Sequence, residues 1–344
     1  MQIKFIKDIS DFQSMKPEWE KLYKNSDCTV FQSFEFNYFA WKNELSTKKQ
    51  NQLTIILIIK NNEIKAIFPF YIDKRKFLRF INDIHADFCD CLAIDDFDFL
   101  QIIERVKKET HFYSMRFINI QKKSLLLQNL QYKDFNNCII RPFERFAFLQ
   151  LEKGCFPENY SGFRSKHRTK FRRVKKKNSI RRHEILTTEK ISFPKKEILS
   201  LKEKMIYLGI RDRTFLPLSQ LKLLENLYNS RILIISTVKS KEKINAFSFI
   251  LQRSDEYLFW IDMYDDSKMV NIFNYICLMQ KLSAEKNIVM NLGRGTYDYK
   301  ISNFMPGINQ LYAIFIFSNK YREFRYFFTK NLISLFKSVY KKIK

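Results

Sequence analysis

The residues best suited to chemistry lie late in the chain, where Gly293, Arg294 and Gly295 follow an apolar run and precede Tyr299 and Lys300. The chain has only six glycines, so two glycines around one arginine indicate a backbone that needs positive φ or the close approach of a ligand. The two cations could stabilise developing negative charge or a phosphate, and the tyrosine hydroxyl could donate a proton. The stretch predicts an anion or acyl-carbonyl site, although a plain tight turn would need the same glycines.

Two aspartates upstream, Asp262 and Asp265, are the candidate general bases for a reaction at this site. Each also fits turn chemistry or helix capping before Met269, which is the commoner role of such an aspartate. The cysteines and histidines lack the spacing of metal ligands. The chain also lacks a P-loop, a dinucleotide fingerprint and a local nucleophile motif. We therefore expect no metal, and chemistry that depends on carboxylate, hydroxyl and cationic groups.

A second candidate site is the stretch from Arg164 to His183, which holds eleven Lys and Arg residues and no acid. Apolar and aromatic side chains recur there at three- and four-residue spacing, which predicts a helix over 157–177 that begins near Pro157 and docks by a narrow seam. The seam consists of Tyr160, Phe163, His167, Phe171 and Val174. The cations lie off this seam, and we expect three of them to contact phosphate: Arg168, Arg172 and Arg173.

The elements that must position these residues occur twice along the chain. Segments 57–72 and 236–251 both read as β-hairpins, with β-branched and aromatic residues around a short polar turn. A helix over 97–108 and the strand "MRFINI" follow the first hairpin. The strand "YLFWIDMY", a helix over 269–286 and the strand "IVMNL" follow the second. This order predicts a duplicated α/β (α+β) fold with domains at 1–143 and 144–319, each a mixed sheet flanked by helices.

Charge is the other strong feature, since the formal net charge is +25. Such a charge attracts phosphates or anionic surfaces, although the abundance of Lys, Ile, Asn and Phe indicates that compositional bias supplies part of it. Segment 320–344 predicts a basic amphipathic helix, which suits a membrane interface and, equally, packing on its own domain. No apolar run reaches the length of a membrane span, and the N-terminus lacks a signal-peptide pattern. We expect a cytoplasmic protein, with peripheral contact to the inner membrane face as an open alternative.

The stretch "NLGRGTYDYK", followed by "LYAIFIF", resembles the closing motif of the GNAT-type acyltransferases with a Fem-like double domain. That family includes peptidoglycan aminoacyltransferases and acetyltransferase-like proteins of cellulose and exopolysaccharide gene clusters. "EWEKLYKNSDCTVFQSFEFNYFAW" resembles the family's opening, and "AIFPFYI" its first-domain strand with an internal proline. The basic helix resembles the one that opens the family's second half. The resemblance implies two tandem GNAT-like domains and an acyltransferase in which Lys300 ends the motif.

The resemblance also implies the substrates. The donor would be acetyl-CoA or another acyl-CoA, or alternatively an aminoacyl-tRNA as in Fem-type relatives. The acceptor would be an amino or hydroxyl group on a cell-envelope or exopolysaccharide sugar, presented as a sugar nucleotide or a lipid-linked precursor. A non-catalytic nucleic-acid-binding protein is the alternative of a different class, but no recognised reading motif accompanies the charge, and we expect no DNA partner.

Overall fold

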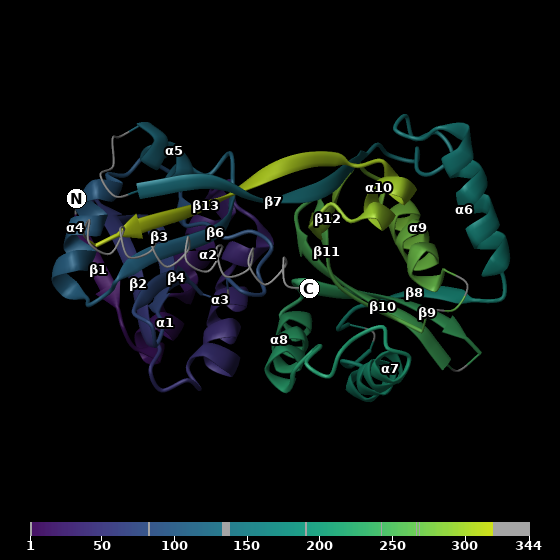
Figure 1. The fold of residues 1–344 in the computed structure, drawn as a ribbon, viewed down its shortest axis with the longest axis horizontal. Helices are drawn as coiled ribbons and strands as arrows, with labels where there is room; N and C mark the ends of the chain where they lie inside the picture. Colours follow the sequence, from purple (N-terminus) through teal and green to yellow (C-terminus); the bar gives the residue numbers. More distant parts are fainter. Residues whose placement is uncertain are drawn as a thin grey trace, which may run out of the picture. The chain divides into compact units, whose positions relative to one another are not determined.

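The computed structural model describes residues 2–81, 83–132, 138–189, 191–241, 243–265, 267 and 269–318 (Figure 1). The chain divides into two compact units, each with its own core. Of the described residues, those within 1–28, 45–143 and 311–318 form unit 1, and those within 29–44 and 144–310 form unit 2. The amphipathic helix expected over 320–344 lies outside the described residues.

Unit 1 is built on a mixed sheet whose strands follow the spatial order β1, β2, β3, β4, β6, β13. All neighbouring strands are antiparallel except β4 and β6, which run parallel, and the short β5 pairs with β3. The strands are β1 (Gln2–Ile6), β2 (Gln52–Lys60), β3 (Glu63–Ile72), β4 (Phe77–Phe80), β5 (Leu92–Ala93), β6 (Ser114–Gln121) and β13 (Gly307–Phe317). The helices are α1 (Ile9–Ser14), α2 (Lys16–Asn25), α4 (Phe99–Glu109) and α5 (Leu125–Tyr132).

The core of unit 1 is a cluster of phenylalanines on neighbouring strands. Phe70 on β3 and Phe117 on β6 stack with ring centroids 4.9 Å apart and an interplanar angle of 7°. Phe80 on β4 lies 5.0 Å from Phe117, and Phe99 adds an edge contact from α4. All four side chains are almost completely buried, so this face of the sheet supplies much of the hydrophobic stabilisation of the unit.

Unit 2 repeats the plan, with the spatial order β8, β9, β10, β11, β12, β7. Again every neighbouring pair is antiparallel except one, β11 with β12. The strands are β7 (Cys138–Leu151), β8 (Arg182–Leu186), β9 (Leu233–Ser240), β10 (Lys243–Arg253), β11 (Glu256–Tyr264) and β12 (Ile288–Arg294). The longer helices are α3 (Phe34–Ala40), α6 (Ser165–Lys177), α7 (Lys195–Tyr207), α8 (Leu218–Asn229), α9 (Val270–Leu282) and α10 (Asp298–Phe304). Short helical turns cover Val30–Gln32 and Trp41–Leu45.

The duplicated fold expected from the sequence is confirmed by this strand order. Hairpin β2–β3 corresponds to β9–β10, the helix α4 to α9, and the parallel partner β6 to β12. Each parallel pair is short, with two paired positions between β4 and β6 and three between β11 and β12. The strands of each pair therefore separate beyond the last paired residue, which leaves room for side chains between them.

Two details differ from the contiguous domains that the sequence suggested. Strand β13 pairs with β6 and so has its last residues in unit 1. Segment 29–44 joins unit 2, where α3 packs on α8 and Phe36 lies 5.6 Å from the Trp260 ring. The local sequence pattern does not reveal that a segment joins the other unit, because this depends on which strand or helix the segment packs against.

The basic helix is also shorter than expected. Helix α6 begins at Ser165, not at Pro157. Pro157 and Gly162 lie in turns before the helix, while Phe163, Phe171 and Val174 are buried together in the core of unit 2. The aromatic seam is therefore confirmed, but its first members precede the helix.

Among the helices of the described residues, none combines the length and the apolar character needed to cross a membrane.

We expect replacement of Phe117 by alanine to lower the free energy of unfolding of unit 1 by about 3–5 kcal/mol, because the buried ring leaves a cavity among three other aromatic rings. Chemical denaturation measures the change. The matched control is Phe143→Ala, since that side chain is 45% exposed. Equal effects of the two substitutions would contradict the proposed core.

Candidate active site

The Gly-Arg-Gly turn at the end of β12 has the backbone geometry that its glycines predict. Gly293 has φ 75° and Gly295 has φ 84°, both in the left-handed region that favours glycine. A Cβ on Gly295 would approach the Tyr297 ring to 2.6 Å. The backbone N–H of Gly293 donates to Asn291 Oδ1 over 2.9 Å, which fixes the start of the turn.

Lys300 is buried beneath this turn. It is 4% exposed, and its Nζ donates to the carbonyl oxygens of Gly293, Arg294 and Gly295 over 3.3, 2.8 and 3.1 Å. Three carbonyl acceptors match the three donors of an ammonium group. Lys300 therefore holds the turn in place, and its charge also lowers the pKa of the nearby Asp262.

Asp262, on β11, is the carboxyl group in unit 2 that best fits a general base. The residue as a whole is partly exposed, but its carboxyl group is enclosed, and this burial raises its pKa to about 7. Hydrogen bonding from Ser248 and the charges of Lys300 and Arg211 oppose the rise. A carboxylate with a pKa near neutrality accepts a proton efficiently at physiological pH.

A chain of buried hydrogen bonds ends on Asp262. Ser248 Oγ donates to Asp262 Oδ1 over 2.7 Å, and Asn274 Nδ2 donates to Ser248 Oγ over 3.0 Å. Ser236 Oγ donates to Asn274 Oδ1 over 2.6 Å, and His183 Nε2 lies 2.8 Å from Ser236 Oγ. Ser236, Ser248 and Asn274 are at most 1% exposed. The chain links four neighbouring strands through one side chain of α9.

The direction of these bonds fixes the protonation of the histidine. Ser236 Oγ uses its single hydrogen to donate to Asn274. It must therefore accept a hydrogen bond from His183, whose Nε2 carries the hydrogen. Burial lowers the pKa of His183 to about 4, which keeps the ring neutral. Every donor therefore points toward Asp262, and bonds aligned in this way strengthen one another in a low-dielectric interior.

Strand register explains why these residues meet. Ser248 pairs directly with Ser236 on one side and with Asp262 on the other. All three lie on the face of the sheet on which α9 packs, and Asn274 projects from that helix. Among the described residues, Ser248 is the sole hydrogen-bond donor to the Asp262 carboxylate, so Oδ2 remains available to accept a proton.

Tyr299, on α10, lies beside this carboxyl group. Although the residue is 40% exposed, burial of its hydroxyl end and the charge of Asp262 raise its pKa well above the usual range. Tyr264 raises it further, and Arg211 partly offsets the effect. Tyr299 therefore keeps its proton at neutral pH. The structure brings Asp262, Tyr299 and Lys300 together, with the Arg294 turn adjoining them.

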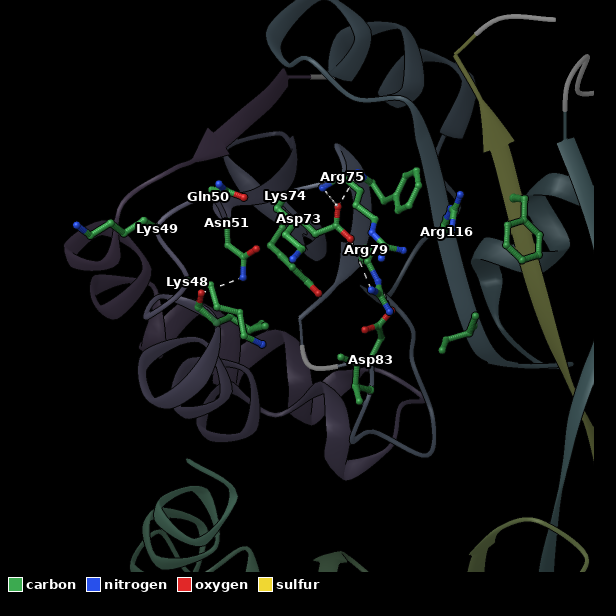
Figure 2. Close-up of a pocket in the computed structure, with 16 residues that line it drawn as sticks. Lys48, Lys49, Gln50, Asn51, Asp73, Lys74, Arg75, Arg79, Asp83 and Arg116 are labelled. Carbon is green, nitrogen blue, oxygen red and sulfur yellow. Dashed lines mark hydrogen bonds and ion pairs between the residues drawn. The ribbon is translucent and has the colours of Figure 1, made fainter. Parts of the chain in front are cut away.

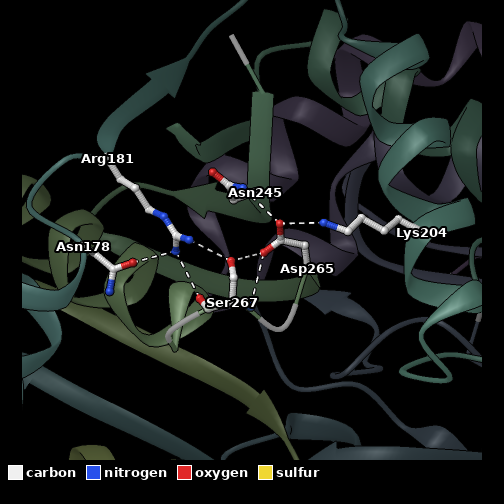
Figure 3. Close-up of polar contacts among 6 residues, drawn as sticks. All are labelled: Asn178, Arg181, Lys204, Asn245, Asp265 and Ser267. Carbon is white, nitrogen blue, oxygen red and sulfur yellow. Dashed lines mark hydrogen bonds and ion pairs between the residues drawn. The ribbon is translucent and has the colours of Figure 1, made fainter. Parts of the chain in front are cut away.

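Asp265, the other candidate base, belongs to a different network (Figure 3). Its Oδ2 accepts from Lys204 over 2.9 Å and from Asn245 over 3.0 Å, and its Oδ1 accepts from the Ser267 hydroxyl. Arg181 in turn donates to the Ser267 side chain over 2.8 Å. These hydrogen bonds outweigh burial and lower the pKa of Asp265. An ionised and fully paired carboxylate is a poor base, and Asp265 instead ties α7 to the end of β11.

The three arginines proposed for phosphate contact lie apart from this cluster, on or near the surface of α6. Arg168 donates to the backbone oxygens of Glu158 and Tyr160, and Arg172 forms an ion pair of 2.5 Å with Glu158. Arg173 is exposed. Two of the three arginines thus help to fix the segment before α6.

Four residues of the site were not found from sequence, namely His183, Ser236, Ser248 and Asn274. Ser248 in "AFSFI" and Asn274 in "IFNYI" are lone polar residues in apolar stretches, whereas Ser236 is followed by Thr237 and His183 lies between Arg182 and Glu184. A polar residue at an inward-facing position of a strand or helix is the signal that could have marked them. Within the described ranges, no group of His, Cys, Asp and Glu side chains is arranged to hold a metal ion.

No protein-family model matches this chain, and no curated protein matches it by sequence. Solved structures do match. The C-terminal domain of an Agrobacterium fabrum protein assigned as a lysylphosphatidylglycerol synthetase aligns with a TM-score of 0.60 and 12% identity, over 95% of this chain and 96% of that domain. FemX aligns with a TM-score of 0.59 and 10% identity, over 91% and 97%. A tandem GNAT protein from the clavulanic acid pathway aligns with a TM-score of 0.50 and 6% identity, over 91% and 98%.

These matches cover nearly the whole chain and both of its units. The chain therefore has the tandem GNAT-like double-domain fold, with Fem-like structural relatives, as the sequence motifs suggested. At such low identity the likeness establishes the fold, and the chemistry has to be argued from the residues described above.

We expect Lys300→Met to lower the free energy of unfolding by about 2–4 kcal/mol, because three carbonyl oxygens lose their donor in a buried turn. Urea denaturation measures the loss. Lys286→Met is the matched control, since Lys286 forms a surface ion pair with Asp255 and its removal should cost under about 1 kcal/mol. A Lys300→Met protein as stable as the control would show that Lys300 does not support the turn.

Proposed function

We propose that this chain is an acyltransferase that moves an acyl group to an amino or hydroxyl acceptor at the Asp262 site of unit 2. The observation that carries the proposal is the enclosed Asp262 carboxyl group, whose pKa is about 7. Among the described residues, it accepts one hydrogen bond, from Ser248 at the end of a buried chain of donors. The fold shared with FemX and a tandem GNAT protein supports the same chemistry by analogy.

In the proposed reaction, Asp262 takes a proton from the acceptor as its nitrogen or oxygen attacks the acyl carbonyl. The new C–N or C–O bond forms, and the bond from the acyl carbon to the thiol or ribose oxygen of the donor breaks. Tyr299, which keeps its proton, can donate to the leaving group and regain a proton from solvent or from Asp262. The Gly-Arg-Gly turn supplies a cation beside the carbonyl, and Lys300 holds that turn in shape.

For the donor, both an acyl-CoA and an aminoacyl-tRNA fit this chemistry, since each presents an activated acyl ester. The segment before α9 argues against a diphosphate at that helix N-terminus. It has no glycine, and the ionised Asp265 stands just upstream, where it would repel a phosphate. The exposed cations of α6 offer an alternative surface for the phosphates of either polyanionic donor.

For the acceptor, we propose an amino or hydroxyl group of a cell-envelope or exopolysaccharide sugar, or of a lipid-linked precursor. One matched structure is assigned as a lysylphosphatidylglycerol synthetase, which supports a lipid as an acceptor beside the sugar. Contact with the inner membrane face, through the segment after residue 319, belongs to the same proposal.

The direct test is a mass-spectrometric screen. Purified protein is incubated with acyl-CoAs or charged tRNAs and with lipid, sugar-nucleotide and lipid-linked acceptors. An acyl adduct that forms with wild-type protein but not with Asp262→Asn supports the proposal. An adduct formed equally by the two proteins, or none with any donor, would contradict it.

We expect Asp262→Asn to reduce the rate of transfer about 10²- to 10⁴-fold, because the amide cannot accept the acceptor's proton. For the wild-type enzyme, kcat/KM should rise with pH with a midpoint near 7, since Asp262 acts as a base only when ionised and its pKa is about 7. Stopped-time assays across pH 5–9 measure both effects.

Two further variants provide the controls. Ser248→Ala removes the hydrogen bond that lowers the pKa of Asp262, so the midpoint should move to higher pH. Asp265→Asn should leave the midpoint unchanged.

The pH dependence of the free energy of unfolding gives an independent check. The folded-state pKa of Asp262 lies above its unfolded value, so the stability linked to its protonation is lost as pH rises through about 7. Asp262→Asn should therefore be more stable relative to wild type at pH 8 than at pH 5.

A further inference from the structure

A cation-rich cavity of about 770 Å³ lies within unit 1 (Figure 2). Six cationic and two acidic side chains line it, together with apolar and aromatic groups. The cations are Lys48, Lys49, Lys74, Arg75, Arg79 and Arg116. A concave surface with so many cations and low-dielectric walls concentrates positive potential. A cavity of this size can enclose a whole small-molecule ligand.

The cavity opens where the parallel pair of unit 1 comes apart. Strands β4 and β6 pair at Phe77 with Ser114 and at Leu78 with Met115, and the pairing ends there. The next residue on each strand is an arginine, Arg79 on β4 and Arg116 on β6, and both line the cavity. The separation of the strands thus places two guanidinium groups at the mouth of the gap.

Both arginines are held in defined orientations. Arg79 Nε donates to Asp83 Oδ2 over 2.8 Å, and its Nη1 lies 3.6 Å from Asp73 Oδ2. The Arg116 guanidinium stacks on the Phe77 ring at 3.3 Å from its centroid, and its Nε donates to Ser114 Oγ over 3.2 Å. Arginines fixed before a ligand arrives lose little entropy on binding it.

The two acids offset only part of this charge, and both are directed at Arg79 (Figure 2). In the described part of the chain, no ion pair joins Lys49, Lys74 or Arg75 to an acid, and all three are exposed at the rim. A single carboxylate could balance only one cation. The remaining positive charge instead suits a ligand with two or more negative charges close together. Phosphate and diphosphate groups have this property.

Asp83 adds a second requirement. Its side chain is 1% exposed, and within the described residues its Oδ1 has no hydrogen-bond partner. A buried acceptor oxygen beside a cavity calls for a donor in the ligand, such as a hydroxyl group. The apolar lining, which includes Tyr71, Ile118 and Phe315, suits the uncharged body of such a ligand.

We propose that this cavity binds a phosphate-bearing compound that also carries hydroxyl groups, in the chemical class of nucleotides and sugar phosphates. The cations hold the phosphate, and Asp83 accepts a hydrogen bond from a hydroxyl group. The site is separate from the acyl-transfer proposal, since it lies in the other unit and its occupancy can be measured without turnover.

Isothermal titration calorimetry of the full chain at fixed ionic strength tests the proposal, with uridine diphosphate, glucose 1-phosphate and farnesyl diphosphate as probes. The two hydroxyl-bearing probes represent the nucleotide and sugar sources, and the prenyl compound offers the diphosphate without hydroxyl groups. At least one hydroxyl-bearing probe should bind more tightly than farnesyl diphosphate. The double variant Lys74→Gln/Arg75→Gln should weaken its binding about ten-fold or more, because two charge-assisted contacts to the phosphate are lost.

The matched control is Lys24→Gln/Lys108→Gln, which removes the same charge from exposed positions of unit 1 outside the cavity. It should bind within about two-fold of wild type, since the bulk charge of the chain acts only weakly at a distance. Arg116→Gln, with its melting temperature as a check on folding, should also weaken binding. Unchanged affinity in the cavity variants, or equal losses in the control, would overturn the site. Tighter binding of farnesyl diphosphate would overturn the assignment of a hydroxyl-bearing ligand.

Discussion

The buried hydrogen-bond chain from His183 to Asp262 is the constraint on which the site in unit 2 depends. A carboxyl group enclosed by protein cannot remain ionised without compensation, and each polar atom that compensates it must itself be satisfied. Ser248 supplies the bond to Asp262, and Asn274 and Ser236 continue the chain. The chain ends at a neutral imidazole. Burial raises the pKa of the Asp262 carboxyl group, and the hydrogen bond from Ser248 limits that rise to a value of about 7.

The two units place different side chains on the same sheet topology. In each unit a parallel pair of strands separates after two or three paired positions. In unit 1 the next residues are Arg79 and Arg116, and the space beside them is cationic. In unit 2 the corresponding strand β11 carries Asp262, and the end of β12 carries the turn held by Lys300. The side chains beyond the paired positions are not needed for the sheet itself, so they can differ between the two units; in the proposals above, those of unit 1 bind an anionic ligand and those of unit 2 transfer a proton.

The sequence predicts the repeated part of this structure well, because hairpins, amphipathic helices and glycine-dependent turns depend on local patterns. The hairpins β2–β3 and β9–β10 and the positive φ of Gly293 and Gly295 are examples. The sequence does not reveal the residues of the site whose roles depend on strand register and on burial. Ser236 and Ser248 become neighbours only when β9 and β10 pair in one particular register. Asp262 and Asp265, three residues apart, have opposite pKa shifts because one is enclosed with a single donor and the other is surrounded by several. Helix α6 begins at Ser165 because the chain forms turns around Pro157 and Gly162. The spacing of the apolar residues alone does not predict these turns.

The most direct measurement of the central claim is the titration of the Asp262 side-chain carboxyl carbon by NMR, in protein labelled with ¹³C at aspartate and assigned with Asp262→Asn. The enclosed carboxyl group predicts a midpoint near 7 for this resonance, and a higher midpoint in Ser248→Ala. A midpoint near the ordinary aspartate value of about 4, or one that Ser248→Ala leaves unchanged, would contradict the role of the buried chain in preparing Asp262 as a base.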